Sequence, residues 1–306
     1  MKIVVSGGTG FIGKPLCRSL SASGHDVILL TRQSNVQLTS TGTHVRVVHW
    51  DGMTRGPWEY ALNGADAVIN LAGKPIADRR WTVASKKSIV QSRIGATRLL
   101  VEACASLPNV PPVLVSGSAI GYYGPRDDQP LREDDPIGSG FLADLCRDWE
   151  QVAMEGERLG MRVVRVRIGM VLGRDGGALP RMFLPFRLFL GGPISPGTQW
   201  VSWIHLEDLA RLLQWAVTTA SVTGAVNAVS PHPIHMQEFA ATLGKALGRP
   251  SWLPVPAFAL RVVLGELSTL LTTGQRVEPS VALKHGFTFW YPHLLPALSE
   301  IFHGAS

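Results

Sequence analysis

Four glycines close to the N-terminus restrict the fold of this chain more than any other feature. They lie in the segment SGGTGFIG, at Gly7, Gly8, Gly10 and Gly13. The last three have the spacing G-x-G-x-x-G, and the first adds the spacing G-x-x-G-x-x-G. The segment follows an apolar run at residues 2–6 and precedes an amphipathic stretch. A strand, a glycine turn and a helix in this order predict the first βαβ unit of a parallel sheet.

Short apolar runs then alternate with helical periodicity. We expect strands at 45–49, 67–71, 113–116 and 162–168, and helices at about 82–106 and 140–159. This alternation predicts an α/β protein with a Rossmann-type, doubly wound parallel sheet.

The second half of the 306 residues is richer in Gly- and Pro-containing loops. Short helices are predicted at 206–217 and 236–247, and a short strand at 225–229. We therefore expect a Rossmann core at residues 1–168 and a smaller C-terminal α+β lid region at 169–306. Some segments of the second region should return to the core.

Composition limits the classes of partner. Hydrophobic residues make up 45% of the chain and charged residues 17%, as in a compact globular protein. The net charge of +6 fits an anionic ligand or ordinary solubility. Because the basic residues are scattered and form no nucleic-acid motif, we expect no nucleic acid partner. No apolar run reaches membrane-spanning length, so we expect no membrane partner.

The cysteines indicate the compartment. Cys17, Cys104 and Cys146 are far apart in the sequence, so neither a disulfide framework nor a metal site is expected. A reducing, cytoplasmic location fits this pattern. The first predicted strand begins at residue 2, so we expect no signal or transit peptide. The sequence leaves open whether the chain forms a homodimer.

The glycine turn predicts a dinucleotide site. Such a turn needs glycine because its backbone approaches a pyrophosphate closely, while the helix N-terminus faces the phosphates. Thr31 and Arg32 end the second strand, where NAD-binding sites usually carry an acidic residue. The arginine suits a 2′-phosphate and favours NADP(H); an ordinary solvated arginine is the alternative. The residues predicted to contact the cofactor are Gly7, Thr9, Gly10, Phe11, Ile12, Gly13, Thr31, Arg32, Asp51, Leu71, Ala72 and Gly73.

With these residues the chain resembles the extended short-chain dehydrogenases/reductases, and within them the atypical, epimerase-like YfcH family with a C-terminal domain of unknown function. The further marks are NLAG, RRW, SGSAIGYYG, VRIGMVLG, LPFRLFLGGPI, SWIHLEDLA and GQRVEPSVAL followed by GF. The resemblance runs nearly end to end. It implies an NADP(H)-binding fold whose members are described as nucleotide-sugar epimerase-like, and some relatives are named for cell division.

The resemblance also implies a catalytic hydroxyl, tyrosine and lysine. Ser118, in SGSAIGYYG, matches the hydroxyl that polarises a substrate carbonyl. The positions of the tyrosine and the lysine fall on Leu142 and Cys146, so the standard proton-transfer pair is absent. Tyr122 and Tyr123 follow Ser118 and are candidate proton donors, or else aromatic walls of a pocket.

Candidate substrate residues follow the fourth strand. Arg79, Arg80 and Trp81 combine guanidinium groups with a flat ring, and Arg93 lies on the next predicted helix. They suit an anionic small-molecule substrate. The alternative is that the arginines are solvated and the tryptophan packs on the next helix.

Two further polar sites have mainly structural interpretations. Arg167 lies within an apolar strand and needs a buried partner, from the protein or from a ligand. His205 and Asp208 stand at a strand-to-helix junction, where acidic residues complement the helix dipole. A metal or acid/base role for His205 is the alternative.

These observations lead to two hypotheses for function. The first is an NADP(H)-dependent oxidoreductase or epimerase-like enzyme acting on a small carbonyl or hydroxyl compound. The second is a non-catalytic NADPH-binding regulator, favoured by the absent tyrosine and lysine. A structural role in cell division rests only on the names of relatives.

Overall fold

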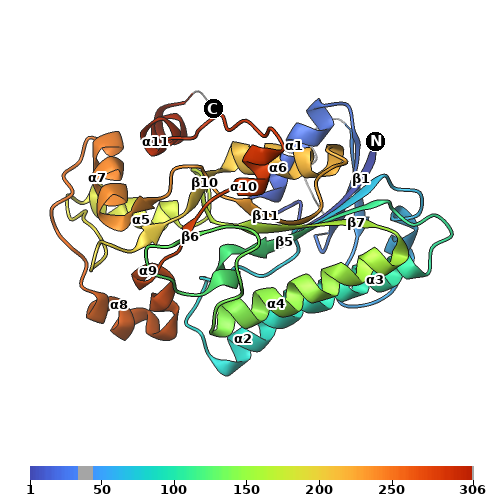
Figure 1. The fold of residues 1–306 in the computed structure, drawn as a ribbon, viewed down its shortest axis with the longest axis horizontal. Coiled ribbons are helices and arrows are strands. Elements are labelled where there is room, and N and C mark those ends of the chain that lie inside the picture. Colours follow the sequence, from blue (N-terminus) through green and yellow to red (C-terminus); the bar gives the residue numbers. More distant parts are fainter. Residues whose placement is uncertain (34–43, 305–306) are drawn as a thin grey trace.

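The computed structural model describes residues 1–33 and 44–304. Its centre is a seven-stranded parallel sheet with the strand order β11-β7-β5-β4-β1-β2-β3 (Figure 1). The strands are β1 (Lys2–Ser6), β2 (Asp26–Thr31), β3 (Val45–His49), β4 (Ala67–Asn70), β5 (Val113–Ala119), β7 (Arg162–Ile168) and β11 (Gly224–Ala228). The chain reverses its direction of travel across the sheet between β1 and β4. In doubly wound sheets, ligands bind at this point, outside the carboxyl ends of the strands.

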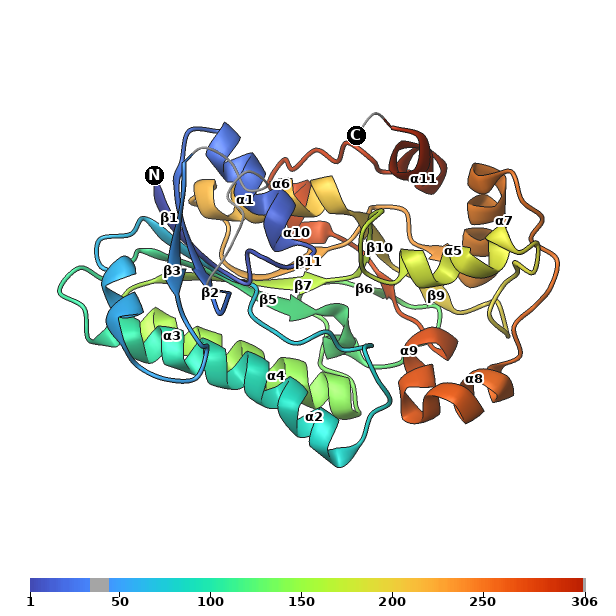
Figure 2. The same ribbon diagram turned by 180° about the vertical axis from the view of Figure 1, so that it is seen from behind.

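Helices cover both faces of the sheet (Figures 1 and 2). One face carries α1 (Gly13–Ala22), α6 (Leu206–Thr218) and α10 (Ser280–Lys284); the other carries α2 (Val83–Val90), α3 (Ala96–Ala105) and α4 (Phe141–Met154). In β1, Ile3 and Val5 are buried in the cluster that includes α1 and α6, whereas Val4 is buried in the cluster that includes α3. Burial on both faces explains why the strands are continuous apolar runs.

The lid region lies at one end of the sheet (Figures 1 and 2). Its helices are α5 (Leu179–Arg187), α7 (Met236–Leu247), α8 (Ala257–Leu264), α9 (Thr269–Thr272) and α11 (Leu294–His303). Two pairs of short strands lie within it, β8 (Met170–Leu172) with β10 (Trp203–His205) and β9 (Trp200–Val201) with β12 (Ile234–His235). A third pair joins β13 (Arg276–Val277) of this region to β6 (Pro130–Leu131) of the N-terminal half. Trp203 and Phe239 are fully buried in a separate apolar cluster of this region.

The two regions exchange segments. Strand β11 pairs with β7, so residues 224–228 extend the sheet of the N-terminal half. Strand β5 is three residues longer than the expected 113–116, because Ser118 and Ala119 pair with Arg167 and Ile168 of β7. That pairing joins segments distant in the sequence, which local periodicity does not reveal.

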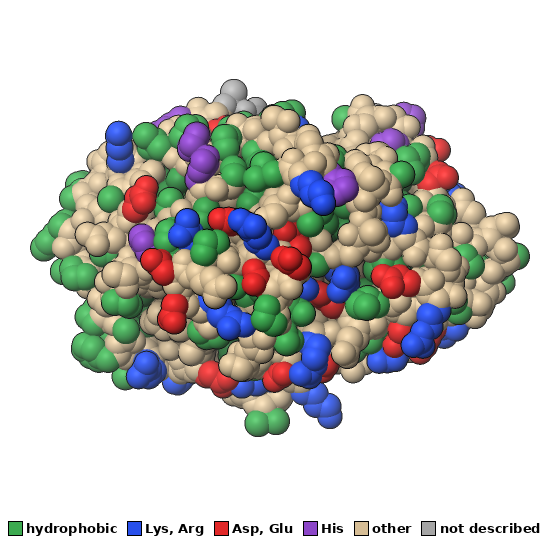
Figure 3. All heavy atoms as spheres, viewed as in Figure 1, with side chains coloured by type: hydrophobic (Ala, Val, Ile, Leu, Met, Phe, Trp, Pro, Cys, Tyr) green, Lys and Arg blue, Asp and Glu red, His purple; other side chains and the backbone are tan. Residues whose placement is uncertain are grey.

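The helix expected at about 82–106 carries an irregularity. A π-helical turn at Gln91–Gly95 separates α2 from α3. No helix in residues 1–33 and 44–304 is long and apolar enough to cross a membrane. On the face shown in Figure 3, acidic and basic side chains are interspersed, and no large field of one sign gathers there.

Candidate functional site

The glycine turn between β1 and α1 has no room for side chains at two positions. Gly7 has a φ of +74°, and a Cβ atom built on it would lie 2.5 Å from the carbonyl oxygen of Leu71. A Cβ on Gly13 would collide with the backbone of Gly7 and Gly8. The turn therefore presents bare backbone at the start of α1, as close approach of a pyrophosphate requires.

This turn forms one wall of a cavity of about 2090 Å³ that extends to the lid region. The cavity is lined by every residue predicted to contact the cofactor: Gly7, Thr9, Gly10, Phe11, Ile12, Gly13, Thr31, Arg32, Asp51, Leu71, Ala72 and Gly73. Small-molecule pockets usually measure about 300–1,000 Å³. The cavity therefore has room for a dinucleotide and a second molecule beside it.

The cavity end near β2 combines a cation with a fixed carboxylate. Arg32 is exposed, and the Thr31 hydroxyl accepts a hydrogen bond from the backbone N–H of Gln33 at 3.1 Å. The Asp51 carboxylate accepts hydrogen bonds from the Thr54 hydroxyl at 2.6 Å and from the backbone N–H groups of Met53 and Thr54. These bonds hold the pKa of Asp51 below its usual range. Asp51 thus shapes the loop after β3 and remains ionised.

A buried hydrogen-bond chain fixes the end of β4. The Asn70 side chain accepts from Ser6 Oγ at 2.6 Å and donates to Thr97 Oγ1 at 2.7 Å. Thr97 Oγ1 also accepts from Trp149 Nε1 at 2.8 Å. Asn70 therefore ties β1 and β4 to the helices beneath them, and holds the following Leu71–Gly73 segment against the cavity.

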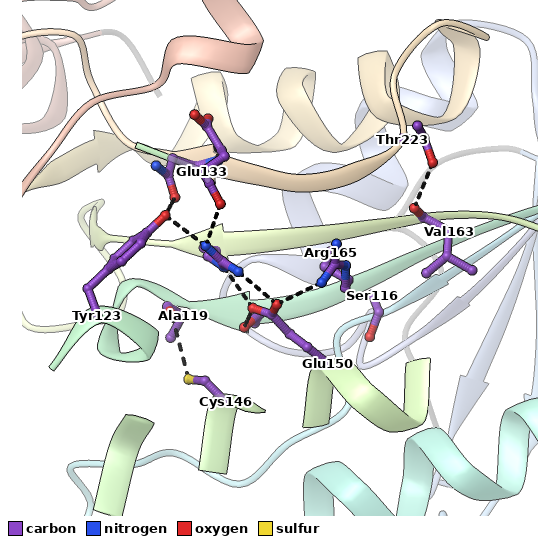
Figure 4. Close-up of polar contacts among 12 residues, drawn as sticks. Ser116, Ala119, Tyr123, Glu133, Cys146, Glu150, Val163, Arg165 and Thr223 are labelled. Atoms are coloured by element: carbon purple, nitrogen blue, oxygen red, sulfur yellow. Dashed lines mark hydrogen bonds and ion pairs between the residues drawn. The ribbon is translucent and has the colours of Figure 1, made fainter. Parts of the chain in front are cut away.

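Ser118 lines the cavity, but its hydroxyl has a partner within the protein. Ser118 Oγ donates to Glu150 Oε1 at 2.7 Å. Arg167 binds both oxygens of the same carboxylate, at 2.9 and 3.0 Å, and Arg165 donates to Oε2 at 3.2 Å (Figure 4). Burial alone would lower the pKa of Arg167, but the hydrogen bonds and charge of Glu150 raise it above its usual range. The buried charge of Arg167 is thus paired within the protein, with Glu150.

The two tyrosines belong to the same network. Tyr123 is fully buried; its hydroxyl donates to Asn227 Oδ1 at 2.8 Å and accepts from Arg167 Nη1 at 2.9 Å. Burial raises the pKa of Tyr123 to about 12. The guanidinium of Arg167 lies 3.5 Å from the ring centroid of Tyr122. Neither tyrosine is among the described residues that line the cavity, so this geometry gives a proton-donor role no support.

Leu142 and Cys146 line the cavity at the positions where the family pattern has tyrosine and lysine. Cys146 Sγ lies 3.6 Å from the carbonyl oxygen of Ala119. Burial, with the charge of Glu150, raises the pKa of Cys146 to about 11. The thiol is therefore neutral near pH 7 and is not an activated nucleophile.

The four predicted substrate residues separate into two pairs. Trp81 and Arg93 line the cavity, whereas Arg79 and Arg80 are not among its described lining residues. Arg80 donates to the carbonyl oxygen of Val262 in α8 at 3.1 Å, which gives it a structural contact. Trp81 packs edge-on against Phe141, with ring centroids 5.2 Å apart.

Sequence reasoning missed other lining residues. Lys74 and Phe141 both line the cavity. Lys74 directly follows Gly73, which was predicted to contact the cofactor, and Phe141 begins α4 directly after Gly140. Their places in the sequence could therefore have indicated them. The lid contribution includes Met182 and Phe186, which lie in or next to the motif LPFRLFLGGPI. The sequence leaves open whether these apolar side chains line a pocket or fill the core of the lid, because that depends on tertiary packing.

His205 has a structural place away from the cavity lining. Its Nδ1 accepts from the backbone N–H of Glu207 at 3.2 Å, and its Nε2 lies 2.9 Å from Glu300 Oε2. The Asp208 carboxylate accepts hydrogen bonds from the backbone N–H groups of Trp290 and Tyr291, each at 2.8 Å. Both side chains thus fasten the C-terminal segment to α6. In the part of the chain that the structure describes, no three His, Cys, Asp or Glu residues are grouped to hold a metal ion.

The sheet order and the glycine-lined cavity define a Rossmann-type α/β protein. Residues 3–228 match the NAD dependent epimerase/dehydratase family, and residues 255–301 match a domain of unknown function, DUF1731. The chain belongs to this epimerase/dehydratase family, which agrees with the resemblance drawn from its motifs.

Two relatives illustrate the membership. The chain is 41% identical over 305 residues to the chloroplastic epimerase family protein SDR39U1 homolog of Arabidopsis thaliana, covering 98% of this chain and 86% of the relative. It is 39% identical to epimerase family protein YfhF of Bacillus subtilis, covering 98% of each.

A solved structure is similar over almost the whole length. The human epimerase family protein SDR39U1, crystallised with NADPH, superposes with a TM-score of 0.88 at 38% identity. The match covers 98% of this chain and 99% of the human chain.

Proposed function

We propose that this protein binds NADP(H) and acts as an oxidoreductase or epimerase-like enzyme on a small carbonyl or hydroxyl compound. The observation that carries the proposal is the continuous cavity, with the bare glycine turn at one end and Ser118 among its other walls. The human relative with a TM-score of 0.88 was crystallised with NADPH, which supports the choice of cofactor.

The residues present fit a phosphorylated dinucleotide. The backbone at Gly7 to Gly13 would hold the pyrophosphate, since the glycines let the turn pack closely on Leu71 and on itself and leave its N–H groups uncovered at the start of α1. The exposed Arg32 would face the 2′-phosphate, because no acidic side chain replaces it at the end of β2. When bound, the cofactor supplies or accepts hydride.

The chemistry proposed for the chain is orientation more than proton transfer. Trp81 and Phe141 form an apolar wall that orients a flat substrate and excludes water from one side. Ser118 polarises the substrate carbonyl when its hydroxyl turns from Glu150 toward the cavity. Because the neutral Cys146 and Leu142 replace the usual pair, the proton comes from water or from the substrate itself.

The experiment that tests the cofactor is calorimetry with NADPH and NADH. NADPH should bind the parent protein more tightly, and the difference should shrink in Arg32→Ala. Arg18→Ala, an exposed arginine of α1 outside the cavity lining, is the matched control and should leave the difference unchanged. Equal affinities for NADPH and NADH in the parent would refute the preference.

Turnover is tested by NADPH oxidation in the presence of fractionated cell extract. Loss of the oxidation in Ser118→Ala, with NADPH binding retained, supports an enzyme. The second candidate, a cofactor-sensing regulator, is favoured by the hydrogen bond of Ser118 to Glu150 and by the missing tyrosine and lysine. Tight NADPH binding without oxidation of NADPH in any fraction would select it.

The three cysteines are all buried and unpaired, which supports a reducing, cytoplasmic location.

A further inference from the structure

Arg93 occupies an unusual place in the helix that passes beneath the cavity. It lies in the π-helical turn Gln91–Gly95, between α2 and α3. Single π-turns within α-helices occur frequently at functional sites, because the extra residue changes which side chains face a ligand. Gln91, Ser92 and Arg93 are consecutive, and all three line the cavity.

The guanidinium of Arg93 has few partners inside the protein. Its one hydrogen bond among the described residues runs from Nη1 to the carbonyl oxygen of Ile89, and at 3.5 Å it is long. No carboxylate of residues 1–33 or 44–304 forms an ion pair with it. Arg162, by contrast, donates to the carbonyl oxygens of Ala216, Val217 and Val222 at 2.6 to 2.8 Å.

The surroundings hold the Arg93 side chain in place. Its Cζ lies 5.4 Å from the ring centroid of Trp149, and its carbonyl oxygen accepts from Thr97 Oγ1 at 2.7 Å. A Cβ on Gly73 would lie 3.1 Å from Arg93 Cζ, so the glycine provides the space for the guanidinium. Thr97 is fastened in turn to Asn70 and Trp149. The position of the guanidinium is therefore fixed, and with a single long hydrogen bond it has donors left for an anionic ligand.

Arg93 also faces the part of the cavity where the family pattern places its lysine. Its charge acts on the thiol of Cys146 and opposes the rise in that pKa, while burial lowers the pKa of Arg93 itself. Two acidic lining residues are already paired, Asp78 with Arg181 and Glu266 with Lys86. Neither of these two carboxylates is paired with Arg93.

We propose that Arg93 binds the acid group of a small organic acid, a carboxylate or a phosphate monoester, whose apolar body lies against Trp81 and Phe141. A planar guanidinium binds such groups through two parallel hydrogen bonds. The inference rests on the proposed function, since this acid is the substrate of the same cavity. The same chemistry is carried by the phosphates of the cofactor, and the test separates the two sources.

The test uses benzoate and phenyl phosphate as probes, with benzamide as the neutral counterpart, on protein saturated with NADPH. Calorimetry should show that at least one acid binds the parent about tenfold or more tightly than benzamide. Arg93→Met should remove that advantage, and Arg93→Lys should retain part of it. Arg98→Met is the control, because Arg98 lies on α3, is exposed and pairs with Glu155 at 3.7 Å.

The outcomes are distinguishable. If NADPH fails to bind the parent, the proposed function falls. If NADPH binds and neither acid is preferred over benzamide, or if Arg93→Met leaves the preference intact, the inference about Arg93 falls alone. If Arg93→Met weakens NADPH about tenfold and leaves the probes unchanged, the arginine serves the cofactor and the inference is overturned. Should Arg93→Met not fold, Arg93→Lys decides, since full retention of the acid preference contradicts a two-bond contact.

Discussion

Replacing Glu150 with glutamine tests whether the buried network is structural. Glu150 is 3% exposed and Arg167 is 2% exposed. The carboxylate accepts four hydrogen bonds, from Ser118, from Arg165 and twice from Arg167. In Glu150→Gln the charge is lost and an amide NH₂ meets arginine donors, which leaves the buried guanidinium of Arg167 without its counter-ion.

The cost follows from the burial of both charges. Removing one partner of a buried ion pair typically destabilises a protein by about 3–5 kcal/mol. A loss of about 4 kcal/mol raises the unfolding equilibrium constant roughly a thousandfold. The measurement is urea unfolding of Glu150→Gln beside the parent protein.

The matched control is Glu155→Gln on the same segment of chain. The Glu155 side chain is 40% exposed and lies 3.7 Å from Arg98, so its loss should change stability by no more than about 0.5 kcal/mol. If the free energy of unfolding of Glu150→Gln were within about 1 kcal/mol of that of the parent, the network would not be holding β5, β7 and α4 together. Ser118 would then be free to act without Glu150.

Two further predictions concern pH and the glycine turn. Burial lowers the pKa of His205, and protonation of Nδ1 would break its bond to the N–H of Glu207, so the unfolded chain binds the proton first. Unfolding at a series of pH values should therefore show stability falling as the pH drops below about 6.5; His205→Gln should flatten this fall and His44→Gln should not. Gly13→Ala should abolish NADPH binding in calorimetry, because its methyl group would displace the backbone of Gly7 and Gly8, which forms the proposed pyrophosphate site. Retained affinity would show that NADPH does not depend on the geometry of this turn.

Local sequence patterns predicted the sheet well. The runs at 2–6, 45–49 and 162–168 are strands with those bounds, because each is rich in the β-branched residues valine and isoleucine. The predicted cofactor residues gather around one cavity, because they all lie near the carboxyl ends of neighbouring parallel strands or at the glycine turn.

Contacts between segments that are distant in the chain could not be predicted from the sequence. Nothing near Arg167 in the sequence indicates that it would meet Glu150, 17 residues away, and Tyr123, 44 residues away. The π-helical turn at 91–95 has no proline to mark it. For the same reason, sequence alone offered Tyr122 and Tyr123 as proton donors, whereas their placement beside Arg167 emerges only when β5 and β7 pair.

The missing catalytic pair and the Glu150 network lead to one expectation about chemistry. Hydride transfer to a carbonyl needs a proton and a stable orientation, and water can supply only the proton. In this chain the phenol of Tyr123 is fully buried and is not among the described residues that line the cavity, so it is not placed to give that proton to a substrate there. In the proposed enzyme, orientation would come from Arg93 and from the apolar wall of Trp81 and Phe141. A substrate with an acid group at one end and a carbonyl at the other uses both, and this geometry favours it over a neutral sugar.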